Sequence, residues 1–289
     1  MAATQATNDA YKPCEHCFAG YKLDGEPKGT MGELGGLSYY LAAGKADEKD
    51  RAIVLGTDIF GLGLVNCKIL ADWFADKTGF PVFVPDYFEG ARRDYIDTSS
   101  IKPQLAALEE PMKTKSFFQR TWTMFSLVSA MLVKVGPRYL YRHRMSRCMP
   151  LAEKFCRDLR EQKGFKRLGW IGYCWGGALA VLLAGETSPL DTAICFHPGT
   201  LTVKNIEDIR RPFMLVCSEE DMSFDSIKPA ALTALASLSS THNIATKVYD
   251  DNPGTVHGFG CRPRLSDPRT REAFERGLER SREWFKEYL

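Results

Sequence analysis

The sequence predicts an α/β fold in which a mostly parallel central sheet is flanked by helices. Two observations lead to this prediction. Short apolar runs with strand character alternate with segments of helical periodicity along most of the chain, as in parallel strands joined by crossover helices. In addition, 44% of the 289 residues are hydrophobic and 26% are charged, so the chain has enough apolar side chains for a sizeable core. Because such architectures often fill one domain of this length, we expect residues 1–289 to form a single domain.

Apolar runs mark the expected strands, and periodic segments between them mark the helices. The runs are Ala52–Thr57, Phe80–Pro85, Arg167–Gly172, Thr192–Phe196, Phe213–Cys217 and Ile244–Tyr249, with Leu37–Leu41 as a further edge strand. Apolar residues recur at helical spacing over 62–73 and again over about 269–289, and this spacing predicts two amphipathic helices. The first ten residues are expected to be disordered.

One interval, residues 86–166, interrupts the alternation of strands and helices. It contains no convincing strand, and helical stretches are expected around 116–135 and 151–162. An insertion of this size in a short-loop architecture builds a lid or one wall of a pocket. The alternative is a crossover helix with an elaborated loop that only covers the sheet.

Charge and cysteine usage narrow the classes of partner. Lys and Arg number 38 against 36 Asp and Glu, giving a net charge of +2, so nucleic acid and anionic membranes are not expected partners. The apolar run at 121–136 carries a lysine and falls short of the ~20 residues that span a bilayer. Nine scattered cysteines favour a reducing, cytoplasmic setting. The Cys14-Glu-His-Cys17 segment has no second cysteine pair to complete a zinc site, so no metal and no cofactor are expected.

The segment Gly172-x-Cys174-x-Gly176-Gly177 carries the strongest functional signal. It follows an apolar strand and precedes a run of small and apolar residues that reads as a helix. A sharp strand-to-helix turn of this kind exposes its nucleophile, and the glycines avoid collisions with neighbouring elements. The partial positive charge of a helix N-terminus favours a thiolate at Cys174. The alternative, a buried structural cysteine, does not require this complete pattern, and the spacing differs from a dinucleotide-binding turn.

Chain order selects the partners of Cys174, because the acid and then the histidine follow the nucleophile in this type of fold. His257 follows the last expected strand, whereas His197 precedes the acidic cluster and His242 precedes that strand. We therefore predict His257 as the base. Asp221, after the run 213–217, is the predicted acid that orients it, with Glu220 and Asp225 as possible substitutes.

Backbone amides are expected to bind the negatively charged oxygen of the reaction intermediate. The N–H of Trp175 directly follows the nucleophile, and Ile59 lies in the loop after an early strand. These are the usual positions of an oxyanion hole.

Taken together, these motifs resemble the dienelactone hydrolase family, especially its fungal members. The likeness includes Asp58-Ile-Phe-Gly61, Pro85-Asp-Tyr-Phe88, the Cys174 turn, the Asp221 segment and His257-Gly-Phe259. It implies an α/β-hydrolase fold and a Cys-His-Asp triad that cleaves lactones or activated esters through a thioester. In bacterial relatives a glutamate at the position of Asp58 helps to activate the thiol, so Asp58 is expected to do the same. Arg262 resembles the second substrate-binding arginine of the family.

The expected substrate is a small lactone or ester. Tyr87, Phe88, Trp175 and Phe259 would form an aromatic wall suited to a flat ring, unless they are ordinary core residues. Two alternatives stay open: acyl transfer, isomerisation or carbon–carbon cleavage in natural-product synthesis, and a non-catalytic ligand-binding protein. The sequence does not specify an oligomeric state.

Overall fold

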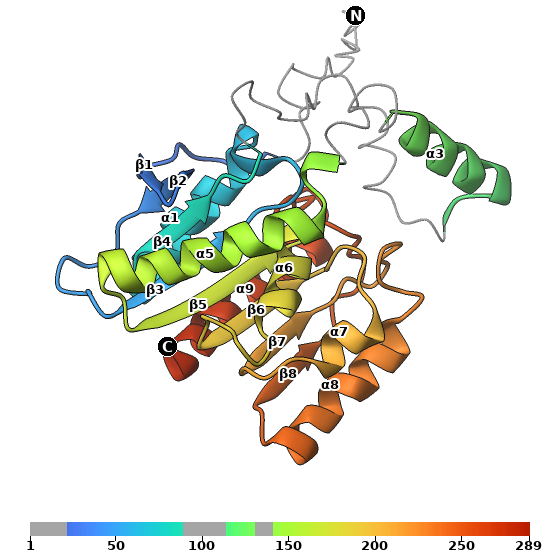
Figure 1. Cartoon of the computed structure of the whole chain (residues 1–289). Helices are drawn as coiled ribbons and strands as arrows, with labels where there is room; N and C mark the ends of the chain where they lie inside the picture. The colour runs from blue at the N-terminus through green and yellow to red at the C-terminus, as the bar shows by residue number, and fades with distance from the viewer. Residues whose placement is uncertain (1–21, 89–113, 131–140) are drawn as a thin grey trace, which may run out of the picture.

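The computed structural model describes residues 22–88, 114–130 and 141–289 and contains one mixed sheet (Figure 1). Its strands in these residues are β1 (Thr30–Leu34), β2 (Leu37–Ala42), β3 (Arg51–Gly56), β4 (Val82–Pro85), β5 (Arg167–Tyr173), β6 (Thr192–Phe196), β7 (Phe213–Val216) and β8 (Thr246–Tyr249). They lie side by side in the order β1-β2-β4-β3-β5-β6-β7-β8. β1 and β2 are antiparallel to their neighbours, and β4, β3 and β5 to β8 pair in parallel. This arrangement is an α/β-hydrolase fold.

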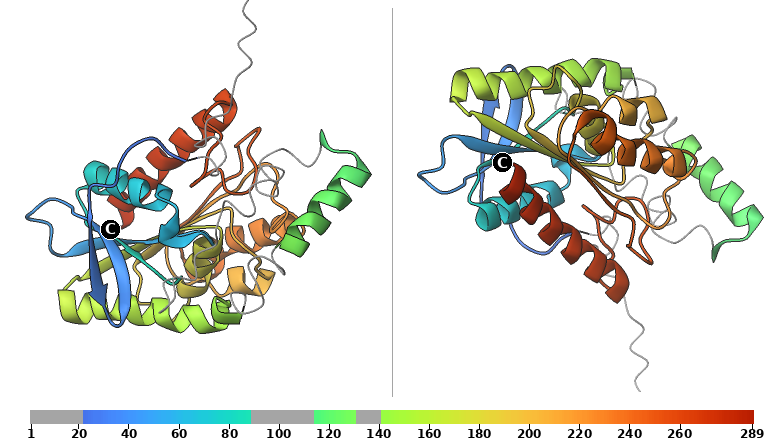
Figure 2. Two further views of the ribbon diagram at one scale, coloured as in Figure 1. Left: turned by 90° about the horizontal axis from the view of Figure 1, so that it is seen from above. Right: turned by 90° about the horizontal axis from the view of Figure 1, so that it is seen from below.

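Helices cover both faces of the sheet (Figure 2). α1 (Asn66–Thr78) and α9 (Pro268–Tyr288) lie on one face, and α5 (Met145–Lys163), α6 (Trp175–Leu183), α7 (Val203–Glu207) and α8 (Lys228–His242) lie on the other. Each layer buries its own hydrophobic cluster against the sheet. Since β3 to β7 are covered on both faces, their residues are almost all buried, as the apolar runs predict.

The strand predictions from the six apolar runs and the two amphipathic helices are confirmed within a few residues. Leu37–Leu41 forms a strand, as predicted, but this strand is not at the edge of the sheet. β1 pairs with its outer side and takes the edge position. β1 was missed because only Leu34 of its five residues is buried, so it has no apolar pattern to recognise.

The 86–166 interval contains α5 and the separate helix α3 (Phe117–Ala130), which projects away from the sheet in Figure 1. Four aromatic side chains of α3 are exposed: Phe117, Phe118, Trp122 and Phe125. The rest of the interval, at 89–113 and 131–140, lies outside the described residues. The choice between lid and surface cover therefore stays a prediction.

The described residues also bear on membrane, metal and redox expectations. No helix within them is long and apolar enough to cross a membrane. They include no group of three or more His, Cys, Asp or Glu that could hold a metal ion, while Cys14, Cys17 and the first ten residues lie outside them. The seven cysteines in these ranges are free thiols.

Candidate active site

Cys174 occupies a strained turn between β5 and α6. Its backbone has φ 54° and ψ −109°, a left-handed conformation that costs a non-glycine residue about 1–3 kcal/mol. Hydrogen bonds hold it there, because the Cys174 amide donates to the Phe196 carbonyl at 3.1 Å and Gly199 N–H donates to the Cys174 carbonyl at 2.8 Å. The side chain is partly exposed at the N-terminus of α6.

The glycines of the turn allow three backbone segments to pack closely. A Cβ on Gly172 would lie 1.9 Å from the Gly176 carbonyl oxygen, and one on Gly176 would lie 2.2 Å from the carbonyl oxygen of Gly56 in β3. Gly176 N–H in turn donates to the Thr57 carbonyl at 2.9 Å. The nucleophile turn is thereby fixed against the end of β3.

We expect Gly172→Ala to destabilise the protein by about 3 kcal/mol or more, because the new methyl group can be accommodated only if backbone moves. Gly185→Ala is the matched control, since its Cβ would meet no atom closer than 3.8 Å. Urea denaturation of the two variants measures the difference in unfolding free energy. Equal stabilities would show that the turn is not packed as described.

Asp221 and His257 are in direct contact at the carboxyl edge of the sheet. His257 Nδ1 lies 2.8 Å and 2.9 Å from the two carboxylate oxygens of Asp221. Asp221 is 2% exposed and also accepts hydrogen bonds from the Ser218 hydroxyl at 3.1 Å and the Ser223 amide at 3.0 Å. These hydrogen bonds fix the orientation of the Asp221 carboxylate.

The two possible substitutes for this acid occupy other positions. Glu220 forms a backbone bridge with Val256, and the Asp225 carboxylate accepts the Asp221 amide at 2.9 Å. Among the three acidic side chains, Asp221 is thus the one that His257 contacts.

The loops that carry Asp221 and His257 are bound to each other. The Thr255 hydroxyl accepts the Glu219 amide at 3.0 Å, the Thr255 carbonyl accepts the Glu220 amide at 3.2 Å, and Gly254 N–H donates to the Glu219 carboxylate at 2.6 Å. The Glu220–Val256 bridge is parallel and continues the pairing of β7 with β8. Acid and base are therefore held as one unit.

His257 also lies within interaction distance of Cys174, and its side chain is 19% exposed. Burial by itself lowers its pKa, but the negative charge on Cys174 and the hydrogen bonds to Asp221 and Cys174 outweigh burial and raise the pKa from 6.5 to about 10. The raised pKa favours the protonated imidazole of His257. The structure brings Cys174, His257 and Asp221 together in one line of contacts.

The two amides expected to form an oxyanion hole lie on adjoining segments. Trp175 is the first residue of α6, so its N–H has no partner within the helix. Ile59 belongs to the turn closed by the Gly61 N–H bond to the Asp58 carbonyl at 3.2 Å, at the end of β3. Since Gly176 is bonded to Thr57, both amides lie close to the nucleophile turn.

Asp58 forms a buried ion pair with Arg262. The Arg262 Nε atom lies 2.9 Å from one carboxylate oxygen of Asp58, with side-chain exposures of 11% and 2%. The Asp58 carboxylate also accepts the Phe60 amide at 3.0 Å and the Cys261 thiol at 3.6 Å. The two residues expected to activate the thiol and to bind substrate are therefore bound to each other.

Removing the cation of this pair should destabilise the fold. We expect Arg262→Met to lower the unfolding free energy by about 3–5 kcal/mol, because it leaves a buried carboxylate unpaired. Arg269→Met is the control, since Arg269 pairs with Asp267 at 3.5 Å and is 66% exposed, and such pairs contribute about 0–1 kcal/mol. Adding Asp58→Asn to Arg262→Met should restore part of the loss in urea denaturation. A loss equal to that of the control would contradict the burial of this pair.

The aromatic residues expected to line the pocket divide into two groups. Tyr87 and Phe88 are buried, with ring centroids 5.4 Å and 5.0 Å from Trp175, and the Trp175 indole N–H donates to the His143 carbonyl at 3.1 Å. Tyr87 and Phe88 therefore pack against the first residue of α6. Phe259 is 2% exposed, yet with His257 and Arg262 it borders a cavity of about 240 Å³ that Arg264 and Arg269 also line.

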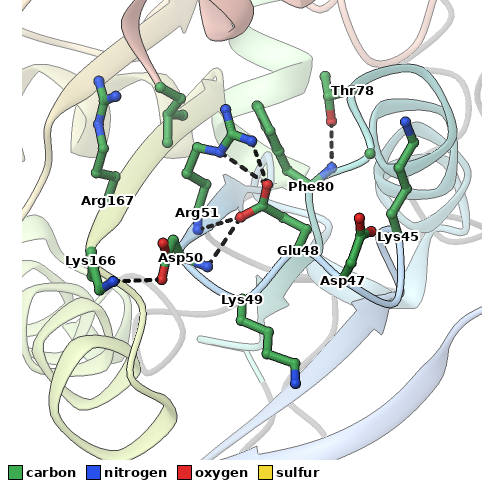
Figure 3. Close-up of a pocket in the computed structure, with 12 residues that line it drawn as sticks. Lys45, Asp47, Glu48, Lys49, Asp50, Arg51, Thr78, Phe80, Lys166 and Arg167 are labelled. Atoms are coloured by element: carbon green, nitrogen blue, oxygen red, sulfur yellow. Dashed lines mark hydrogen bonds and ion pairs between the residues drawn. The ribbon is translucent and has the colours of Figure 1, made fainter.

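A larger hollow of about 750 Å³ lies at the opposite, amino edge of the sheet (Figure 3). Charged side chains dominate its wall and pair with one another: Glu48 binds Arg51 at 2.6 Å, and Lys166 binds Asp50 at 3.0 Å. It is distant from Cys174, since residues 51 and 167 begin the strands β3 and β5 whose other ends flank the nucleophile. The carboxyl edge is therefore the candidate active site because of the side chains gathered there, although the hollow at the amino edge is larger.

Comparison with known proteins identifies the family of the chain. The profile described as the dienelactone hydrolase family matches residues 37–289. The chain belongs to the dienelactone hydrolase family. It is accordingly a hydrolase of ester or lactone bonds.

Relatives in fungi and animals match almost the whole chain. Hydrolase pyvD of Aspergillus violaceofuscus is 28% identical over 96% of this chain and 97% of its own length. Hydrolase tropI of Talaromyces stipitatus is 25% identical, covering 94% and 95%. The carboxymethylenebutenolidase homolog of Mus musculus is 21% identical, covering 96% and 98%.

Solved structures of this hydrolase family share the fold. The dienelactone hydrolase-like promiscuous phosphotriesterase P91 from metagenomic libraries has a TM-score of 0.58 at 18% identity, covering 87% of this chain and 92% of its own. The dienelactone hydrolase of Anabaena variabilis has a TM-score of 0.54 at 11% identity, covering 91% and 98%. At these identities the likeness is one of fold.

Sequence reasoning missed the residues that support the acid and the base. Ser218 and Thr255 each bind their neighbours through hydroxyl groups, but loop hydroxyls are too common in a sequence to be singled out. His197 was excluded as the base by chain order, and the structure places its ring 5.0 Å from that of His257. Its position directly after a buried strand was the sequence feature that could have placed His197 near the active site.

Proposed function

We propose that the protein cleaves a small lactone or activated ester by nucleophilic attack of Cys174, with His257 and Asp221 completing a triad. The observation that carries this proposal is the position of His257, whose ring contacts both the Asp221 carboxylate and the Cys174 side chain. A histidine held between an acid and a strained, partly exposed thiol is the arrangement of a covalent hydrolase.

The first step forms a thioester. The Cys174 thiolate attacks the carbonyl carbon, and the Ile59 and Trp175 amides bind the oxygen that becomes negative. The carbon–oxygen bond then breaks, and the His257 imidazolium gives its proton to the departing alkoxide. Asp221 stabilises the imidazolium and keeps its second nitrogen directed at the sulfur.

The second step hydrolyses the thioester. Acylation removes the negative charge of Cys174, which is the first of the influences that raise the pKa of His257. The imidazole is then neutral and takes a proton from water as the water oxygen attacks the thioester carbon. The carbon–sulfur bond breaks, the acid is released, and the Cys174 thiolate and His257 imidazolium are restored. Loss of one charge thus converts His257 from proton donor to proton acceptor.

A cavity borders the proposed base His257, and Cys174 is not among the described residues of its wall. The cavity of about 240 Å³ beside His257 is bordered by Phe259, Arg262, Arg264 and Arg269. We propose that Phe259 and Arg262 contact the acyl part of the substrate, and that Tyr87 and Phe88 act through Trp175. Asp58, bound to Arg262, would influence the thiol only after that pair opens.

The acyl-enzyme can be trapped with p-nitrophenyl acetate. Acid quenching followed by intact and peptide mass spectrometry should show one acetyl group on Cys174, removed by hydroxylamine, with an initial burst of p-nitrophenolate. Acetyl on another residue, with unmodified Cys174, would refute the proposal. A stable adduct without release of acetate would instead support acyl transfer.

A further inference from the structure

His197 lies between the nucleophile turn and the base loop. It directly follows β6, and its neighbours Phe196 and Gly199 hold the backbone of Cys174 through the two hydrogen bonds described above. On the other side, its ring meets His257 edge to face, with centroids 5.0 Å apart and an interplanar angle of 63°. His197 therefore lies between the turn that carries Cys174 and the loop that carries His257.

The imidazole of His197 accepts a hydrogen bond from the base loop. Gly260 N–H donates to His197 Nε2 at 3.1 Å, three residues after His257. A Cβ on Gly260 would lie 2.6 Å from the Phe196 ring and 3.0 Å from His197 Nε2, so a larger residue there would break this approach. Gly260 is buried, and a buried amide without a hydrogen-bond partner destabilises the fold.

The hydrogen bond requires neutral His197 with its proton on Nδ1. Burial lowers the pKa of His197 well below 6.5, and the positive charges of His257 and Arg262 lower it further. The side chain is 0% exposed. It stays an acceptor while its neighbour His257 is charged.

The backbone of His197 is also constrained. Its φ is 33°, unusual for a residue other than glycine, and its amide is bound to the Val216 carbonyl of β7 at 2.9 Å. The backbone that carries the ring is therefore fixed to β7, the strand that leads to Asp221.

We propose that His197 is a positioning residue for His257: its neutral Nε2 anchors the base loop at Gly260, and its ring edge keeps the His257 imidazole facing Cys174. Asp221 fixes one nitrogen of His257, and His197 fixes the plane of the ring. This role rests on the proposed function, but its structural part does not depend on the substrate.

Three variants test this role. His197→Phe keeps a ring of similar width and removes the acceptor, whereas His197→Gln places an amide oxygen near the position of Nε2. His242→Gln, on the exposed end of α8, is the control. For p-nitrophenyl acetate turnover we expect kcat of His197→Phe to fall by about 10- to 100-fold with KM within about twofold, since small misplacements of a reacting group have effects of this size. His197→Gln should recover most of the loss.

Alkylation of Cys174 by iodoacetamide across pH separates positioning from stability and needs no turnover. His197→Phe should shift this profile away from that of wild type, because the imidazolium no longer faces the sulfur, while His197→Gln and His242→Gln should match wild type. A matching profile for His197→Phe, or equal losses of kcat in His197→Phe and His197→Gln, would overturn the role. If wild-type Cys174 takes no acetyl group, the proposed function fails, and the alkylation profiles still decide the role of His197.

Discussion

Replacing Cys174 with alanine is expected to lower kcat/KM for p-nitrophenyl acetate by about 10³-fold or more, because the nucleophile is lost. The thiol is partly exposed, so its removal leaves little cavity and the melting temperature should stay close to that of wild type. Stopped-flow assays with a folded variant would measure the loss. Retention of a tenth of the activity would exclude Cys174 as the nucleophile.

The same substitution should change the titration of His257. The charge on Cys174 and the hydrogen bond to it are two of the influences that raise the pKa of His257 to about 10. With alanine at 174 both vanish and burial still favours the neutral form, so the pKa should fall. NMR titration of the imidazole protons measures it, and an unchanged pKa would show that the two side chains do not interact.

Replacing Asp221 with asparagine is expected to lower kcat by about 10²- to 10⁴-fold, because an amide no longer favours the productive tautomer or stabilises the imidazolium. The amide has nearly the same shape, so the loss should exceed any change in stability. Glu220→Gln and Asp225→Asn are the matched controls, since they remove the other two acids of the same loop. Should either control lose as much kcat as Asp221→Asn with its melting temperature unchanged, the acid would be misassigned.

The sequence predicted most of the fold because buried parallel strands leave continuous apolar runs, as in β5 and β6. It could not predict β1, whose residues are mostly exposed. For the site, the glycines around Cys174 and the order of Asp221 and His257 were sufficient to name three residues. The Asp58–Arg262 ion pair joins loops more than a hundred residues apart in the sequence, and the contact of His197 with His257 joins loops about sixty residues apart. No local sequence pattern predicts contacts over such separations.

The sequence also could not separate aromatic residues that line a pocket from those that fill the core. Tyr87, Phe88 and Phe259 are the kinds of residue that line a pocket and also the kinds that fill a core. Tyr87 and Phe88 are buried against Trp175, and of the three only Phe259 borders the cavity. Composition alone does not separate these two uses of a ring.

The bridge between Glu220 and Val256 has an evolutionary consequence. Asp221 and His257 lie in loops that extend the pairing of β7 with β8, in the last third of the chain. The long interval between β4 and β5 lies earlier in the sequence. Sequence changes in that interval can therefore leave the pairing of the Asp221 and His257 loops in place during divergence. They are less free on the side of Cys174, because the Trp175 indole N–H donates to the carbonyl of His143 in the same interval. Variation that spares this contact would alter the surroundings of the substrate while the acid and the base stay together.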